Sequence, residues 1–281
     1  MSIATDQTSA IPQERAQQRP RNVGMPFYQQ VAMLSARSLR TMLRTPAVIL
    51  PALFISGFFL FVYEATLGDA AGSIPGIAGV DYIAFILPLS VISASLSGAG
   101  IAGQNLVRDI ETGYFDKLLL TPVSRGALIL GQIVAGGVVL AFQTIVIIAM
   151  ALLLGLNSAT GIAGLLVVLA FSMLIGIGFA GFTVGVALQS GNAAATQGAG
   201  FLFFPFTFLT ATFVPVELLG GWLKTVATIN PITYILEAMR SVLITGWEAD
   251  VLASGIVACV LLGVVPYIYA LISLKARAAR R

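Results

Sequence analysis

Six stretches of this chain are long enough to cross a lipid bilayer and contain almost no charged residues. They lie near residues 46–66, 82–103, 127–154, 162–188, 198–214 and 251–274. Only 10% of the 281 residues are charged, whereas an average soluble domain has about 25%. So few charges cannot cover the surface of a water-soluble globule of this size. The sequence therefore predicts an all-α polytopic membrane protein with six transmembrane helices.

The positions of the basic residues predict the orientation of these spans. Thirteen of the 15 Lys and Arg residues lie before the first span, between the second and third spans, or after the sixth. Only Lys224 and Arg240 lie elsewhere. Because segments rich in Lys and Arg stay in the cytoplasm, we expect both termini there. An odd number of spans would place the two basic termini on opposite sides.

Composition excludes several kinds of catalytic and metal site. The chain has no His and one Cys, Cys259, so it cannot form an internal disulfide, a Cys/His metal site or a catalytic Ser-His pair. No GxxxxGK[ST] phosphate loop occurs. The basic residues are explained by the orientation of the spans, so they do not indicate nucleic-acid binding. Residues 1–26 lack the apolar core of a signal peptide and predict a disordered cytoplasmic tail. Residues 276–281 predict a short basic tail.

The spans are rich in small residues and contain several prolines. The glycine series are Gly98, Gly100 and Gly103 in the second span, and Gly176, Gly178, Gly181 and Gly185 in the fourth. A GxGxxG string binds dinucleotides only between a strand and a helix, so these glycines instead predict close helix packing. Pro51, Pro88, Pro205 and Pro266 are expected to kink their helices, and the backbone groups released there need internal partners.

A segment before the first span predicts an amphipathic helix at the cytoplasmic interface. Over residues 27–44 apolar side chains gather near one helical face, and Arg37, Arg40 and Arg44 recur on another. Such a helix either anchors the chain to anionic lipid or acts as a lever that touches a cytoplasmic partner.

The loop at residues 104–125 mixes charges of both signs with an apolar patch that includes Phe115. Gly113 allows a turn, Thr121-Pro122 stops a short helix, and Ser124 is placed to cap the third span. This mixture favours docking into a groove on another protein, although an ordinary solvated loop remains an alternative.

The connection between the fifth and sixth spans predicts two short helices on the outer side. The first covers residues 216–227. The second covers 232–244, with Asn230 as its N-cap, Pro231 after it, and Gly246 at its end. Glu237 and Arg240 lie one turn apart on the second. Both are too short to span, so they are expected to re-enter the outer leaflet, as a lid or as a packed cap.

Two stretches, RDIETGYFDKLLLTPVSRGALILGQ (108–132) and FVPVELLGGWLKTVATINPITYILEAMRS (213–241), resemble permease subunits of the ABC-transporter type-2 family. The similarity is greatest to the daunorubicin-resistance class of bacterial drug exporters, over roughly residues 27–275. The resemblance implies that the amphipathic segment is a connecting helix and that the outer pair is the family's re-entrant hairpin. It also implies a coupling helix that meets the ATPase, formed by Arg108, Asp109, Glu111, Gly113, Tyr114, Phe115, Asp116 and Lys117.

The family implies an assembly of two permeases, identical or related, with two ATPase subunits in the inner membrane of a bacterium. ATP and Mg would then bind the ATPases, and this chain would hold no cofactor and be no enzyme itself. Transport would proceed by alternating access through walls formed by the second and fifth spans. The candidate lining residues are Phe85, Leu89, Ile92, Leu96, Phe201, Phe204, Phe208 and Phe213.

Aromatic walls with few charges suit amphipathic drug-like or lipid-like substrates. A lipid-linked glycan is an alternative cargo that the sequence leaves open. An ion-coupled secondary transporter is less favoured, because such proteins need ionisable groups within the bilayer, and Glu64 and Asp81 lie only at span ends. A membrane-embedded enzyme is disfavoured by the absence of paired carboxylates and of a His base.

Overall fold

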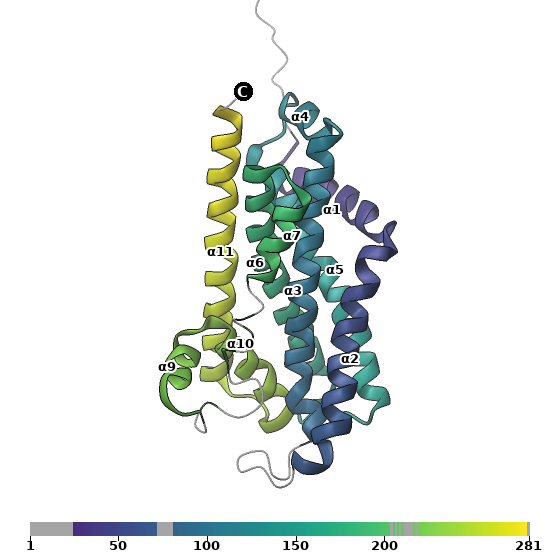
Figure 1. Ribbon diagram of the computed structural model, residues 1–281, viewed down its shortest axis with the longest axis vertical. Helices are drawn as coiled ribbons and strands as arrows, with labels where there is room; N and C mark the ends of the chain where they lie inside the picture. The colour runs from purple at the N-terminus through teal and green to yellow at the C-terminus, as the bar shows by residue number, and fades with distance from the viewer. Residues whose placement is uncertain are drawn as a thin grey trace, which may run out of the picture.

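The computed structural model is a bundle of long helices, with no strand in the part of the chain that it describes (Figure 1). It describes residues 25–71, 81–202 and 219–279 and single residues between 205 and 216, except for the side chains of residues 46–48, 69–71, 96, 97 and 99. Predictions for residues 1–24 and 280–281 therefore lie outside the described residues.

Five helices within the described residues are long and apolar enough to cross a membrane. They are α2 (Pro46–Ala71), α3 (Tyr82–Glu111), α5 (Arg125–Leu153), α6 (Gly161–Ser190) and α11 (Ala249–Ala279). These helices overlap predicted spans one to four and six. The α3 helix continues to Glu111, into what was predicted to be a loop, and α11 continues to Ala279, into the predicted basic tail. The fifth predicted span begins within α7 (Ala193–Phe201), and most of its remainder lies outside the described residues. Six spans therefore stay a prediction.

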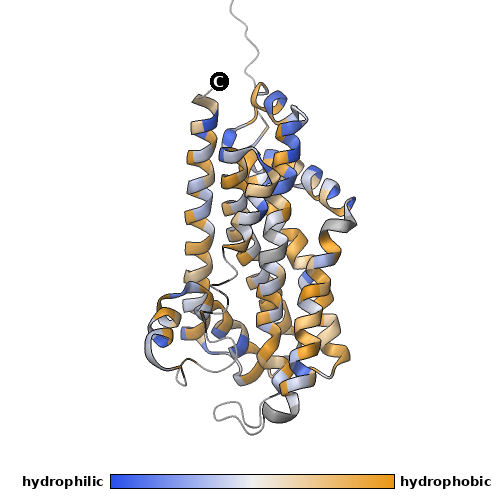
Figure 2. Cartoon of the chain, in the orientation of Figure 1, coloured by the Kyte–Doolittle hydropathy of each residue, from blue (hydrophilic) through white to orange (hydrophobic). Residues whose placement is uncertain are grey.

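Shorter helices occupy the two ends of the bundle (Figure 1). At one end, called here the α4 end, lie α1 (Phe27–Leu43) and α4 (Tyr114–Leu119). At the other, the α10 end, lie α9 (Gly221–Ile229), α10 (Pro231–Arg240) and a π-helical turn, η3 (Ser241–Thr245). Hydrophobic residues dominate the middle of the bundle, and hydrophilic residues gather towards its two ends (Figure 2).

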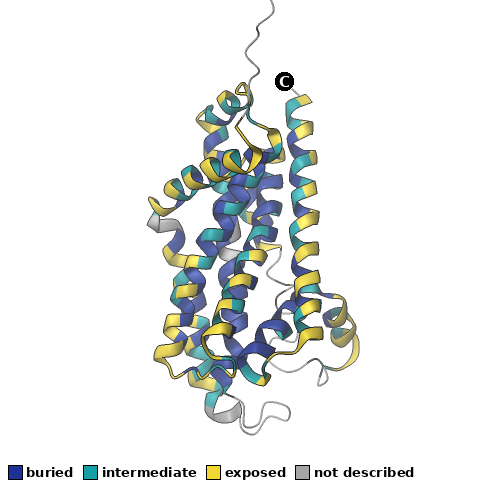
Figure 3. Ribbon diagram, turned by 180° about the vertical axis from the view of Figure 1, so that it is seen from behind, coloured by how far each residue is buried: buried dark blue, intermediate teal, exposed yellow. Residues whose placement is uncertain are grey.

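The α3 helix lies at the centre of the bundle, whereas α2 and α11 lie at its edge (Figure 3). Along α3 the apolar side chains are nearly all buried, and they form much of the core together with α5, α6 and α10. On α2 and α11 large apolar side chains such as Phe54, Leu261 and Val265 are exposed. Because lipid tails are as apolar as these side chains, such faces are stable in a bilayer.

The glycines of α6 allow close contacts with two neighbouring helices. A Cβ atom added at Gly178 or Gly185 would collide with α11, at the Leu262 carbonyl oxygen or the Tyr269 ring. One added at Gly176 would lie 2.8 Å from the Leu140 side chain of α5. The prediction that these glycines serve close packing is thus confirmed.

The helices at the α10 end differ from the predicted pair in their bounds. The first begins at Gly221 rather than at residue 216. Gly220 is its N-cap, and Gly221 has a φ of 60°. The second begins at Pro231, and the Asn230 side chain accepts a hydrogen bond from the Ile232 N–H, so the predicted cap is confirmed. Its last turn widens into η3, which ends at Gly246 as predicted.

Candidate coupling interface

The short α4 helix is placed by a reversal of the chain after α3. The α3 helix ends at Glu111, and Gly113 has a φ of 69°, the left-handed conformation that glycine adopts without strain. The α4 helix then runs for six residues and ends before Thr121-Pro122, as predicted. Ser124 caps α5 by accepting a hydrogen bond from the Ala127 N–H.

A polar network joins three helices beneath this turn. Asp109 of α3 accepts two hydrogen bonds of 2.7 Å from the Arg37 guanidinium of α1. The same carboxylate accepts a bond of 3.0 Å from the Gln132 amide of α5, and Gln132 in turn accepts one from Asn105. Asp109, Gln132 and Asn105 are buried. Their polar groups are therefore paired with one another where water is largely excluded.

Arg37 also connects the network to α4. Its guanidinium carbon lies 3.8 Å from the centre of the Tyr114 ring, a distance typical of a cation–π contact. Hydrogen bonds to the Asp109 carboxylate raise the pKa of the Arg37 guanidinium above its ordinary value. The side chain thus stays charged and holds α1, α3 and α4 together.

The eight predicted coupling residues divide into a buried and an exposed group. Asp109 is 5% exposed, and Phe115 is 2% exposed within the apolar core at this end. Arg108, Glu111 and Lys117 are exposed, whereas Gly113, Tyr114 and Asp116 are intermediate. In this arrangement Asp109 and Phe115 position α4, and the exposed residues are the ones that a partner could touch.

The α1 helix lies across the first half of α5. A Cβ atom added at Gly131 would lie 2.6 Å from the Leu34 Cβ, so the two helices are in very close contact. At the start of α5 the Ser124 N–H donates a hydrogen bond of 2.9 Å to the Gln30 side chain. The predicted amphipathic helix is present, with Met42 buried and with Arg40 and Arg44 exposed.

Three residues of this end were missed at the sequence level. Asn105 lies one helical turn before Asp109 on the same face of α3, and Gln132 is a polar residue inside the third predicted span. Polar residues within a span usually mark internal contacts, which was the available signal for Gln132, whereas Asn105 fell in the predicted loop. Leu120, 89% exposed after α4, carried no signal beyond its place in a loop.

Four of the eight candidate lining residues have described side chains, and these four differ in burial. Phe85, Leu89 and Ile92 are at most 4% exposed and belong to the internal core of this chain. Phe201 is 64% exposed at the end of α7. The side chains of Leu96, Phe204, Phe208 and Phe213 lie outside the described residues, and a transport role for this set stays a prediction.

At the α10 end, Arg240 is buried against the start of α3. Its Nε donates a hydrogen bond of 3.0 Å to the Phe85 carbonyl, and its guanidinium lies 3.6 Å from the centre of the Phe85 ring. Burial lowers the pKa of Arg240 to about 9, and the charge of nearby Glu237 acts in the opposite direction. The guanidinium is therefore still protonated at neutral pH.

The fold and the helices at the α4 end together indicate the class of protein to which this chain belongs. At least five apolar helices of spanning length form a multi-pass membrane protein, with charged surface helices tied to one end of the bundle. A family model described as ABC-2 type transporter matches residues 29–244. The chain thus belongs to the ABC-2 type transporter family, and it is a membrane permease.

Known relatives agree with this assignment. The probable doxorubicin resistance ABC transporter permease protein DrrC of Mycobacterium tuberculosis is 23% identical over 219 residues, 78% of each chain. The daunorubicin resistance ABC transporter permease protein DrrB1 of Streptomyces coeruleorubidus is 27% identical over 78% of this chain and 74% of its own length. The putative transport permease ycf38 of Pyropia yezoensis is 25% identical over 75% and 73%. The predicted resemblance to drug-resistance permeases is confirmed.

Proposed function

We propose that this permease exports amphipathic drug-like or lipid-like molecules, driven by two separate ATPase subunits that bind at the α4 end. The observation that carries the proposal is the network of Arg37, Asp109 and Gln132. Because it joins the two surface helices α1 and α4 to α3 and α5, a displacement of either surface helix is passed to two spans at once.

The assembly would contain two permeases, identical or related, and two ATPases that hold the ATP and Mg. The α4 end would face the cytoplasm of a bacterial cell, with both termini on that side of the inner membrane. The exposed basic residues Arg40, Arg44, Arg108 and Lys117 at this end support that orientation. Closure of the ATPases would then shift the paired permeases between inward-facing and outward-facing packings.

The substrate class is supported by the names of the relatives, two of which refer to doxorubicin or daunorubicin resistance. The bundle offers an apolar environment, and its ionisable side chains lie towards the two ends. A small amphipathic molecule that partitions into the membrane needs no charged site at the bilayer centre.

Reconstitution with a partner ATPase tests the proposal. Doxorubicin is the probe, and both its uptake into inverted vesicles and ATP hydrolysis are measured. Replacing exposed Glu111 or Lys117 with Ala should lower the uptake by about tenfold, since a contact residue at an interface contributes about 1–2 kcal/mol. The control Lys224→Ala removes an exposed charge at the α10 end and should leave uptake unchanged. Normal uptake by both variants at the α4 end would exclude the coupling role.

A further inference from the structure

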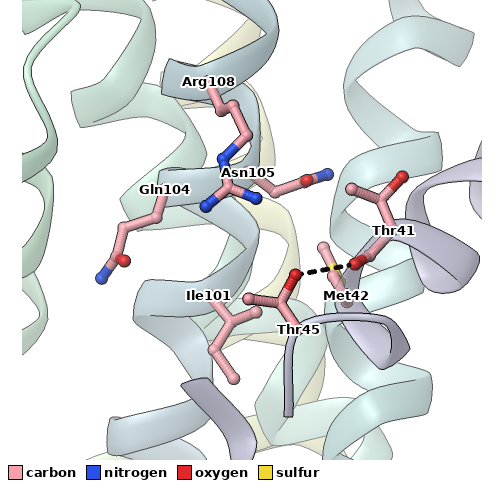
Figure 4. Close-up of a pocket in the computed structure, with 7 residues that line it drawn as sticks. All are labelled: Thr41, Met42, Thr45, Ile101, Gln104, Asn105 and Arg108. Carbon is pink, nitrogen blue, oxygen red and sulfur yellow. Dashed lines mark hydrogen bonds between the residues drawn. The ribbon is translucent and has the colours of Figure 1, made fainter. Parts of the chain in front are cut away.

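A small cavity opens where α1, the turn into α2 and α3 meet (Figure 4). It holds about 30 Å³ and is lined by Thr41, Met42, Thr45, Ile101, Gln104, Asn105 and Arg108. A cavity of about 10–15 Å³ measured in this way admits one water molecule, so this one admits two or three oxygen-sized groups. Asn105 of the polar network and Arg108 of the predicted coupling residues lie on its wall, whereas none of the predicted transport-path residues does.

The chemistry of the lining is that of a site for an anion. No carboxylate belongs to it, and Asp109, which follows Arg108 in the sequence, is already engaged by Arg37 and Gln132. Arg108 directs its guanidinium towards the cavity (Figure 4) and makes no ion pair within the described part of the chain. The Thr41 and Thr45 hydroxyls donate to backbone carbonyls one helical turn back, and such hydroxyls can rotate towards a ligand. A lining that offers a guanidinium and hydroxyl groups as donors suits a phosphate group.

The level of the cavity along the bundle suggests where such a phosphate comes from. The apolar sequence of α2 starts directly after Thr45, at Pro46, and Arg108 is the first charged residue after the long apolar part of α3. The cavity therefore lies at the boundary between hydrocarbon and headgroups. Its lining also includes apolar Met42 and Ile101, so a cation adjoins an apolar wall, as an anionic amphiphile requires.

We propose that this cavity binds the phosphate group of an anionic phospholipid from the membrane leaflet at the α4 end. The lipid would join the α1–α2 turn to α3 on the face of α3 next to the Asp109 network, with which the cavity shares Asn105. Inorganic phosphate offers the same chemistry from solution, and the two sources are separable by experiment. The inference depends on the membrane level of the cavity and not on the proposed transport activity.

Native mass spectrometry of the full-length chain in neutral detergent tests this site. Phosphatidylglycerol is titrated at high ionic strength, where attraction to exposed charges is screened. Arg108→Gln should weaken the retention of one phosphatidylglycerol per chain by about tenfold or more, because it removes a charge-assisted hydrogen bond. Thr45→Val should weaken it by a few-fold. The control Arg40→Gln removes the same charge from an exposed residue that does not line the cavity and should leave retention unchanged.

Each outcome decides the question. If Arg108→Gln and Arg40→Gln weaken retention equally, the attraction belongs to the whole basic surface and the site is refuted. If inorganic phosphate displaces the lipid through Arg108 at millimolar concentration, the source is soluble and the lipid proposal fails. Arg108 is exposed, so its replacement should not unfold the chain. An unchanged melting temperature in phosphatidylcholine nanodiscs verifies this, and Thr45→Val provides a second test without any change of charge.

Discussion

Two arginines, one at each end of the bundle, lie against aromatic rings but are built in opposite ways. Arg37 is 34% exposed, belongs to a surface helix, and pairs with the carboxylate of Asp109. Arg240 is 7% exposed and donates to the Phe85 backbone carbonyl at the start of α3. Water can replace the partner of Arg37 when α1 moves, whereas moving Arg240 would leave a charge in an apolar core. The α4 end is thus suited to movement and the α10 end to anchoring.

The sequence around Phe85 helps to explain this anchor. Pro88 has no N–H to donate to the carbonyl of Ala84, so the hydrogen-bond ladder of α3 is interrupted in its first turns. The next carbonyl along the chain, that of Phe85, accepts from Arg240. The Phe85 carbonyl, three residues before Pro88, and Arg240, 155 residues further along the chain, therefore meet at one buried point, which ties α10 to α3.

Removing the anchor should have the largest effect on stability. Arg240→Ala leaves a cavity, removes a donor from the Phe85 carbonyl and takes a positive charge away from Glu237. We expect the free energy of unfolding to fall by about 3–5 kcal/mol. Urea denaturation in detergent micelles measures this. Arg240→Met fills the space without the charge, so a smaller loss in this variant would assign the difference to packing, and no loss in either would contradict the anchor.

Breaking the ion pair at the α4 end should have a smaller effect. In Asp109→Asn the neutral side chain no longer balances the charge of Arg37. The new amide NH₂ group is a donor, and it would lie against the donor groups of Arg37 or Gln132. We expect a loss of about 2 kcal/mol, less than for a fully buried pair, because Arg37 can turn towards water. The same denaturation measurement applies. A loss equal to that of Arg240→Ala would show that the two ends are equally fixed.

The sequence could predict the elements of the α4 end but not their contacts. Apolar runs located the spans, Gly113 and Ser124 located the turn and the cap, and the periodicity of residues 27–44 located α1. The pairing of Arg37 with Asp109, 72 residues apart, depends on how α1 crosses the bundle, and no local pattern encodes that. Phe115 was expected on a docking surface because a six-residue helix is too short for its apolar face to be identified from periodicity.

The close packing of α1 against α5 can be tested separately from the Arg37–Asp109 ion pair. In Gly131→Ala the new methyl group would lie 2.6 Å from the Leu34 Cβ, so α1 must shift. We expect a loss of about 1–2 kcal/mol. The control Gly263→Ala lies in α11 with no atom within 4 Å of the new methyl group. It should stabilise its helix by up to about 1 kcal/mol. If both variants lose stability equally, the close contact between α1 and α5 is not what Gly131 provides.

Replacing each of the two arginines with lysine keeps the positive charge but changes the hydrogen-bond geometry, and at Arg37 this should have the smallest effect. Arg37→Lys keeps a cation beside Asp109 but loses one of the two parallel hydrogen bonds and most of the stacking on Tyr114. Because the site is partly exposed, we expect a loss of only about 0.5–1 kcal/mol. Arg240→Lys should lower the free energy of unfolding by more. An ammonium is more strongly hydrated than a guanidinium, so it loses more on burial, and it cannot cover the Phe85 ring. Both losses come from the same denaturation measurement. Equal losses of unfolding free energy in the two Lys variants would mean that exposure to water does not make the α4 end different from the α10 end. The α4 end would then be no freer to move than the α10 end.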